Sequence, residues 1–201
     1  MLQTQSTKES LKKSKKQQSK KTLTIKNIKK TAYLKYYYPV EFMAALMTSV
    51  IDNSSKVAEY IYSCRQMGIQ ILPPDINKGE GNFSVDNGNI RYGLTAIKSI
   101  GRPVIQAIVE ERELRGPYKN LKDFIERLSG KEVNKRTIES FIKAGVFDSF
   151  GGTRKQFMMI YLQILDQVNQ ERKYSMTGQM SLFDFVGDEQ KSDFDIPTIN
   201  N

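Results

Sequence analysis

The sequence predicts a mainly α-helical protein with one small β-hairpin and polar segments at both ends. Several segments repeat apolar residues at helical spacing, and they begin after Asn or Thr and end at Gly. One Asn-Gly pair, Asn87-Gly88, lies between two short alternating runs, which is typical of a β-hairpin. Residues 1–30 are rich in lysine and poor in large apolar residues. We therefore expect a helical body between disordered N-terminal and C-terminal tails.

The predicted elements before the hairpin are two helices and a strand. Pro39 suits the first turn of a helix, and apolar residues follow it at helical spacing. A second helix is expected from an Asn53 cap to Gly68, because glycine commonly ends a helix. The run "IQILPPDIN" then predicts a short strand that ends at Pro73-Pro74.

Helical sequence dominates after the hairpin, and glycine separates the predicted helices. Asparagine or threonine precedes three of them, as expected for residues that cap a helix N-terminus. The predicted elements are a short helix over 93–100, a helix over 103–115 that Gly116-Pro117 breaks, two helices that run from Asn120 to Gly130 and from Asn134 to Gly145, and a long amphipathic helix after Thr153.

The residue content narrows the chemistry that this chain can perform. It has no histidine, which excludes His-dependent triads and most zinc sites. Its one cysteine, Cys64, excludes an internal disulfide and is expected to be a buried helix residue in a reducing compartment. No apolar run approaches the roughly 18 residues that span a bilayer, and no signal peptide is evident. We expect a cytoplasmic protein with no membrane partner.

The net charge of +9 belongs to one end of the chain. Residues 1–35 hold eleven lysines and one glutamate, and the other 166 residues hold 20 basic and 21 acidic side chains. The pI near 9.5 is therefore a property of the N-terminal tail and does not by itself indicate a basic folded body. Such a tail can contact phosphates with a steep salt dependence, and a solvated tail without a specific partner is the alternative.

Two short motifs predict a repeated anion-binding unit. "IKSIG" at residues 97–101 and "FDSFG" at residues 147–151 both run apolar, charged, Ser, apolar, Gly, and each is expected between two helices. Two helices joined by a tight turn with glycine form a helix-hairpin-helix. Gly101 is expected to permit the tight turn and a close approach to a ligand. The next helix, starting near Pro103, would point its free N–H groups and its dipole at an anion there.

The expected ligand of these hairpins is the phosphate backbone of duplex DNA, so the contacts would fix position without reading base sequence. The second motif is the weaker candidate, since Asp148 puts a negative charge where a phosphate would lie. For that copy, packing that closes the domain is the alternative. The candidate contact residues are Lys98, Ser99, Ile100, Gly101, Arg102, Ser149, Gly151, Arg154 and Lys155.

Four longer segments resemble the alpha subunit of bacterial DNA polymerase III. They are "TAYLKYYYPVEFMAALMTSVIDN", "VAEYIYSCRQMGIQILPPDIN", "IRYGLTAIKSIG" and "FIKAGVFDSFG". The resemblance covers residues 31–201 and is to the end of the fingers region and the tandem helix-hairpin-helix domain behind it. Residues 1–30 do not resemble the family, and their composition predicts a disordered Lys-rich tail. The resemblance implies a helical fingers segment over 31–75, a helix-hairpin-helix DNA-binding domain over 76–173 and a flexible tail over 174–201.

The resemblance also accounts for apolar residues near the C-terminus. In that family a short segment similar to Q-L-S/D-L-F binds the sliding clamp, and the matching residues here are Gln179, Met180, Ser181, Leu182 and Phe183. The side chains suit this role, because Gln179 would hydrogen-bond at a pocket rim while Leu182 and Phe183 fill an apolar pocket. Packing of this tail on its own domain is the alternative.

The resemblance implies no catalytic residue and no metal ligand in this chain. The family's magnesium-binding aspartates belong to the palm, upstream of the matching segments, and the only Asp-x-Asp here, Asp193-Phe194-Asp195, is interpreted as linker. We expect a fragment that does not polymerise alone, with duplex DNA, the sliding clamp and the rest of the holoenzyme as partners. The alternatives are a free-standing DNA-binding adaptor and the inert product of a truncated or frameshifted gene.

Overall fold

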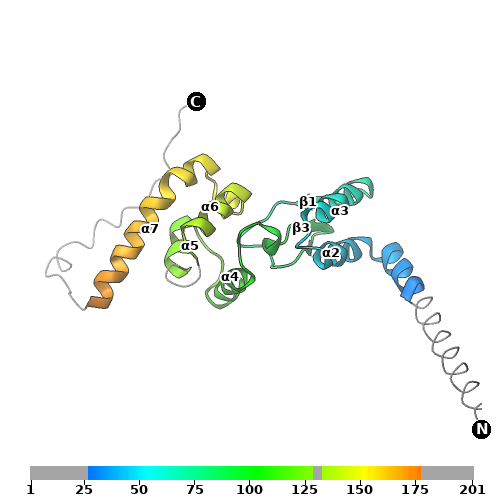
Figure 1. The fold of residues 1–201 in the computed structure, drawn as a ribbon, viewed down its shortest axis with the longest axis horizontal. Helices are drawn as coiled ribbons and strands as arrows, with labels where there is room; N and C mark the ends of the chain where they lie inside the picture. The colour runs from blue at the N-terminus through cyan, green and yellow to red at the C-terminus, as the bar shows by residue number, and fades with distance from the viewer. Residues whose placement is uncertain (1–26, 129–132, 178–201) are drawn as a thin grey trace, which may run out of the picture. The chain divides into compact units, whose positions relative to one another are not determined.

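The structure is a computed structural model that describes residues 27–128 and 133–177 (Figure 1). The chain divides into two compact units with the boundary between Met43 and Ala44. The predicted fold class is confirmed, because the described residues are mainly helical and include one small sheet. None of the helices in these residues combines the length and the apolar character that a membrane span needs.

The first unit begins its described part with a helix that the sequence pattern did not predict. Residues 27–37 are helical, and the helix therefore includes the end of the segment that was assigned to the Lys-rich tail. Helix α2, Pro39–Ser49, follows after one residue, with Pro39 at its first position as predicted. Hydrogen bonds from Tyr38 N to Leu34 O (2.8 Å) and from Phe42 N to Tyr38 O (2.9 Å) continue the helical pattern across the junction.

The second unit starts within α2, at Ala44, and continues with the predicted second helix and a three-stranded sheet. Helix α3, Ser54–Gln66, has Asn53 as its cap, whose side chain accepts a hydrogen bond from Lys56 N at 3.1 Å. Gly68 ends this region with a φ of 74°. The strands are β1 (Ile71–Leu72), β2 (Ser84–Asp86) and β3 (Asn89–Arg91), in the order β1-β3-β2.

The predicted β-hairpin is confirmed, with Asn87 and Gly88 both at positive φ, 51° and 76°. Two left-handed residues are typical of the two-residue turn that matches the twist of the strands. Strand β1 lies parallel to β3, with Ile71 opposite Ile90. Strand β1 belongs to the predicted fingers segment over 31–75, and β3 belongs to the predicted DNA-binding domain over 76–173. The sheet therefore joins these two segments, and their limits stay a prediction.

The rest of the second unit is helical. One predicted helix is wrong: residues 93–100 form only a single 3-10 turn, η1 (Leu94–Ala96), because Gly93 is held extended against Asn82 and Phe83 and the chain leaves helical geometry again at Ile97. The other predicted helices are present, with bounds α4 (Arg102–Arg115), α5 (Leu121–Leu128), α6 (Lys135–Ala144) and α7 (Arg154–Thr177), and η2 (Asp148–Phe150) precedes α7.

The predicted caps account for where these helices begin and end. The Asn120 and Asn134 side chains accept hydrogen bonds from Asp123 N (2.8 Å) and Thr137 N (3.1 Å). Gly116 and Gly145 follow α4 and α6 at positive φ. The predicted stop at Gly130 lies outside the described residues.

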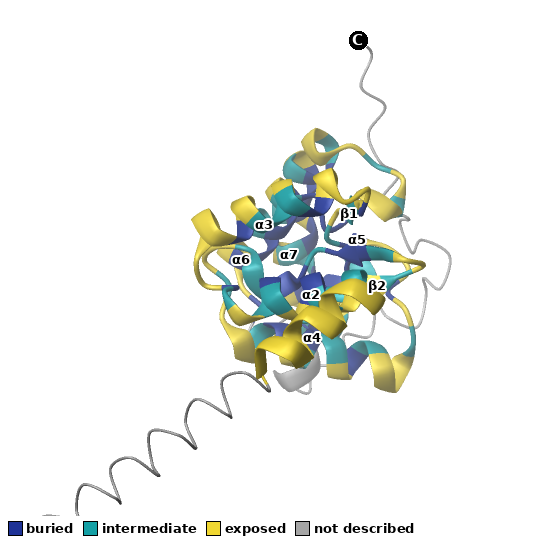
Figure 2. Ribbon diagram, turned by 90° about the vertical axis from the view of Figure 1, so that its right-hand side faces the viewer, coloured by how far each residue is buried: buried dark blue, intermediate teal, exposed yellow. Residues whose placement is uncertain are grey.

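A hydrophobic core lies between α4, α5, α6 and α7, whose inward faces are buried in Figure 2. Phenylalanine rings fill its centre: Phe124 meets Phe147 edge-on with ring centroids 5.0 Å apart, and Phe141 lies 6.0 Å from Phe147. Ile76 N donates to Val146 O at 3.0 Å and so joins the segment behind β1 to the loop after α6. This core positions both predicted hairpins.

Candidate nucleic-acid interface

The first predicted hairpin connects η1 to α4 and presents its polar residues to solvent. Lys98, Ser99, Gly101 and Arg102 are exposed, whereas Ile100 is half-buried and packs against the core cluster. Ile100 therefore anchors the loop while its neighbours remain accessible. The structure places all five predicted residues in this one surface loop and at the helix start that follows it.

The residue that makes the first hairpin turn is Ser99, and the predicted role of Gly101 in the turn is wrong. Ser99 has a φ of 69°, in the left-handed region that side chains with a Cβ rarely adopt, whereas Gly101 has an ordinary φ of −74°. A Cβ added at Gly101 would lie 3.6 Å from Cδ of Pro103, an ordinary contact. The fold therefore does not require glycine there, and its missing side chain leaves the surface in front of α4 open.

The N-terminus of α4 lies directly behind this loop, with Gly101 as the cap residue and no side chain capping the first turn. The first N–H groups of a helix have no intrahelical acceptor, and the helix dipole favours an anion beside them. Arg102 is the first helical residue, and its one described ion pair is to Asp52 at 2.8 Å, with both side chains largely exposed. Lys98 makes no hydrogen bond or ion pair within the described residues.

The second predicted hairpin connects α6 to α7 and is more tightly built. Val146 and Phe147 are buried, Ser149, Gly151 and Lys155 are exposed, and Gly151 has a φ of 85°. Helix α7 begins with a capping box. Gln156 N donates to the Thr153 hydroxyl at 3.2 Å, and Thr153 N donates to the Gln156 side chain at 2.8 Å. These bonds use the backbone N–H groups of Thr153 and Gln156, which are then not free to bind a ligand at the helix start.

Arg154 is held by the second hairpin itself. Its Nε donates to Asp148 Oδ1 at 3.1 Å, its Nη2 donates to Asp148 Oδ2 at 2.7 Å, and its Nη1 donates to the Lys143 carbonyl at 3.2 Å. The hydrogen bond to Asp148 raises the pKa of Arg154 above its usual range. Gly145 lies beneath this pair, and a Cβ there would overlap the guanidinium group.

The two motifs therefore share a sequence pattern but not a backbone conformation. The left-handed residue is the third of "IKSIG", Ser99, and the fifth of "FDSFG", Gly151. A single 3-10 turn precedes the first motif, whereas the ten-residue helix α6 precedes the second. The second motif also has Gly152 and Thr153 between its last residue and the next helix. The expected repeat in register is therefore wrong in detail, and the first hairpin is the more accessible one.

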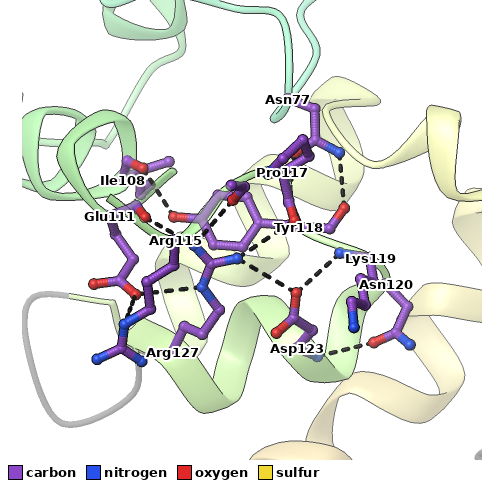
Figure 3. Close-up of polar contacts among 11 residues, drawn as sticks. Asn77, Ile108, Glu111, Arg115, Pro117, Tyr118, Lys119, Asn120, Asp123 and Arg127 are labelled. Atoms are coloured by element: carbon purple, nitrogen blue, oxygen red, sulfur yellow. Dashed lines mark hydrogen bonds and ion pairs between the residues drawn. The ribbon is translucent and has the colours of Figure 1, made fainter. Parts of the chain in front are cut away.

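Arg127 is a structural residue that sequence reasoning did not single out, and it fixes the far end of α4 (Figure 3). Its guanidinium group donates to the carbonyls of Glu111 (2.8 Å) and Gly116 (3.1 Å), which satisfies acceptors at the C-terminus of that helix. It also pairs with the Glu111 carboxylate at 3.3 Å and lies 4.3 Å from the Tyr118 ring centroid. Nothing in the pattern of an amphipathic helix distinguishes such an arginine from an exposed one.

Two further contacts hold α4 in place. The Arg112 guanidinium group donates to the carbonyls of Ile76 (3.1 Å) and Gly79 (2.8 Å). The Asn77 side chain makes two hydrogen bonds of 2.8 Å to the backbone of Tyr118, one as donor and one as acceptor. These contacts, like those of Arg127, fix the C-terminal part of α4 and the turn that follows it.

The predicted clamp-binding residues and the Asp193-Phe194-Asp195 segment lie outside the described residues. Within residues 27–128 and 133–177, no group of three or more acidic or cysteine side chains is arranged to hold a metal ion. The site is therefore built from backbone, lysine and arginine. Such donors suit an anion.

Comparison with known proteins points to the same region. A family model for the helix-hairpin-helix motif matches residues 68–157, which include both hairpins. DNA polymerase III subunit alpha of Thermus aquaticus is 44% identical over 153 residues, or 76% of this chain and 12% of that protein.

Two further relatives carry the same name. The protein of Saccharopolyspora erythraea is 41% identical over 165 residues, and that of Chlamydia pneumoniae is 39% identical over 174 residues. These alignments cover 81% and 84% of this chain but only 14% of each relative. The chain spans about an eighth of the length of these proteins, and it belongs to the family of bacterial DNA polymerase III alpha subunits, of which it represents a segment with a helix-hairpin-helix motif.

Proposed function

We propose that this chain binds the sugar-phosphate backbone of duplex DNA through its first hairpin and serves DNA replication as a segment of the polymerase III alpha subunit. The observation that supports this most strongly is an accessible helix start. Lys98 and Arg102 flank an exposed loop that leads directly into the uncapped first turn of α4. Free N–H groups, a helix dipole and two cations at one place are the donors that a phosphate needs.

The contact is proposed to be independent of base sequence. The loop offers backbone N–H groups and side chains that reach phosphate oxygens, and such contacts carry no base information. The half-buried Ile100 would anchor the loop while it contacts DNA, and Arg112 and Arg127 would hold the C-terminal part of the helix that follows it. Rigid donors lose less entropy on binding than mobile ones do.

Fluorescence anisotropy of a labelled 20-base-pair duplex tests this proposal. Lys98→Ala should weaken binding by about three- to tenfold, to the same extent on several unrelated sequences. Lys119→Ala is the matched control, because this exposed lysine lies beyond the opposite end of α4 and should leave affinity unchanged. Equal affinities for all three proteins would contradict a role of the first hairpin.

The segment Gln179–Phe183 is proposed to bind the sliding clamp. Its support is the sequence pattern alone, with one polar and two large apolar residues at the spacing of a short peptide ligand. Ordering a tail opposes the gain from burying Leu182 and Phe183, so an affinity on the micromolar scale is expected. A peptide of residues 175–187 should bind purified clamp, and a version with Leu182→Ala and Phe183→Ala should not. Equal binding by both peptides would refute this proposal.

Template-directed nucleotidyl transfer with magnesium is proposed for the complete alpha subunit and not for this chain alone. The described residues provide cations and backbone donors, and these suit positioning of DNA. A primer-extension assay with magnesium and all four deoxynucleoside triphosphates tests this. No extension is expected from the chain alone, and template-dependent extension would overturn the assignment.

A further inference from the structure

The helix of residues 27–37 has an aromatic surface that neither hairpin uses. Three of its tyrosines are largely exposed: Tyr36 at 78%, Tyr37 at 60% and Tyr33 at 54%. Their rings touch one another, with centroids 4.5 Å apart for Tyr33 and Tyr37 and 4.8 Å apart for Tyr36 and Tyr37. Large rings so close together on an exposed helix indicate a binding surface.

Helical spacing puts lysines on the same face as these rings. Lys29, Tyr33 and Tyr37 follow one another at intervals of four residues, and Tyr36 comes seven residues after Lys29. Side chains at such intervals lie on one side of a helix. Lys30 lies seven residues before Tyr37 and borders the same side. We define Lys29, Lys30, Tyr33, Tyr36 and Tyr37 as the basic-aromatic face.

The charge on this helix has one sign. Residues 27–40 contain three lysines and no acidic residue, and the next acidic side chain after them is Glu41. Lys29 and Lys30 are exposed and have no ion pair among the residues that the structure describes. The basic-aromatic face therefore has accessible rings beside lysines that no acidic residue in the described part of the chain neutralises. Such a surface suits a polyanion that also has aromatic groups.

We propose that the basic-aromatic face binds single-stranded nucleic acid by stacking unpaired bases on its tyrosines while its lysines contact phosphates. Single-strand binding commonly joins a cationic surface to aromatic side chains, because every base has a flat face to stack. A duplex keeps its bases stacked inside and would offer these rings only its backbone. This inference goes beyond duplex binding by the first hairpin and rests on different residues.

Binding of a labelled 15-nucleotide oligothymidylate by the full chain tests the proposal. Replacing Tyr33, Tyr36 and Tyr37 together by Ala should weaken single-strand affinity at least about tenfold. Replacing the same three residues by Phe should retain affinity within about twofold, because phenyl rings still stack. Tyr62→Ala is the matched control, since Tyr62 is 65% exposed on α3, and it should leave affinity unchanged.

Two further measurements separate stacking from general charge attraction. The chain has ten tyrosines and no tryptophan, so stacking on the face should quench tyrosine fluorescence, and this quenching should be lost in the triple Ala variant. Duplex affinity of the triple Ala variant should stay within about twofold of wild type, because the first hairpin is intact. Unchanged single-strand affinity of that variant, or equal losses on single strand and duplex, would overturn the proposal.

Discussion

Arg154 and Asp148 form a bidentate ion pair within the second hairpin, with distances of 3.1 Å for Nε to Oδ1 and 2.7 Å for Nη2 to Oδ2. The corresponding arginine of the first hairpin, Arg102, makes a single bond of 2.8 Å to Asp52. Each is the first residue of the helix that follows its hairpin. The two hairpins therefore differ in how strongly the arginine is bound within the protein. Arg154 is held by several hydrogen bonds, whereas Arg102 has one exposed ion pair that it can exchange for another anion.

Asp148→Asn should strengthen duplex DNA binding. The amide removes the negative charge beside the second hairpin and weakens the hold on Arg154, so the affinity is expected to rise about two- to fivefold. Anisotropy with a duplex at a fixed salt concentration measures this.

Asp166→Asn controls for the change in net charge, because Asp166 is an exposed residue in the middle of α7. A gain with Asp148→Asn and not with Asp166→Asn is expected. Equal gains would show that the Arg154 pair does not limit DNA binding.

Ser99→Gly should stabilise the protein. Ser99 has a φ of 69°, and a left-handed conformation costs a residue with a Cβ roughly 1 kcal/mol relative to glycine. Greater freedom of glycine in the unfolded chain offsets part of this, so a net gain of about 0.5 kcal/mol in the free energy of unfolding is expected. Urea denaturation followed by circular dichroism measures the change.

Ser149→Gly is the matched control at the same place in the second motif, where the φ of the serine is not positive. This substitution should destabilise the protein slightly, because glycine adds freedom only to the unfolded chain. The same sign of change for both variants would contradict the difference in backbone conformation between the motifs.

Tyr118 should make stability fall at high pH. Its hydroxyl is buried and donates to the Ile108 carbonyl at 2.8 Å, and burial raises the pKa of Tyr118 from 10.0 to about 12. The folded state holds this proton more tightly than the unfolded state does. The contribution to stability is therefore complete below about pH 10 and is lost as pH rises toward 12.

Tyr118→Phe tests this pH dependence by urea denaturation at several pH values. The variant should be less stable by about 1 kcal/mol at pH 8, because the Ile108 carbonyl loses its donor, and it should lose less stability than wild type between pH 10 and pH 12. Tyr62→Phe, at an exposed site on α3, should reproduce the wild-type profile. A parallel loss for Tyr118→Phe and wild type would refute the role of this phenol.

Local signals in the sequence predicted most of the fold. Asn53, Asn120 and Asn134 cap helices as expected, because a short side-chain acceptor at a helix start acts through neighbouring residues only. The Asn87-Gly88 turn is local in the same way. The helix of residues 27–37 was not marked by local pattern, because its large apolar residues are exposed and follow no buried stripe, and the resemblance implied helix only from residue 31.

The site was less predictable than the fold, because its geometry depends on contacts between distant residues. The pattern "IKSIG" located an exposed hairpin, but it assigned the turn to Gly101 when Ser99 makes it. The pair between Arg102 and Asp52 joins residues fifty positions apart, and no local pattern marks it. The contribution of Arg127 is of the same kind, since it acts on the end of another helix.

The salt dependence of duplex DNA binding tests the central claim most directly. Wild type and a variant with Lys98→Ala and Arg102→Ala would be compared by anisotropy between 50 and 200 mM salt. If both side chains contact phosphates, the variant should bind more weakly at low salt, and the slope of log affinity against log salt should be smaller in magnitude by about 2. An unchanged slope and affinity would show that the first hairpin does not bind the DNA backbone.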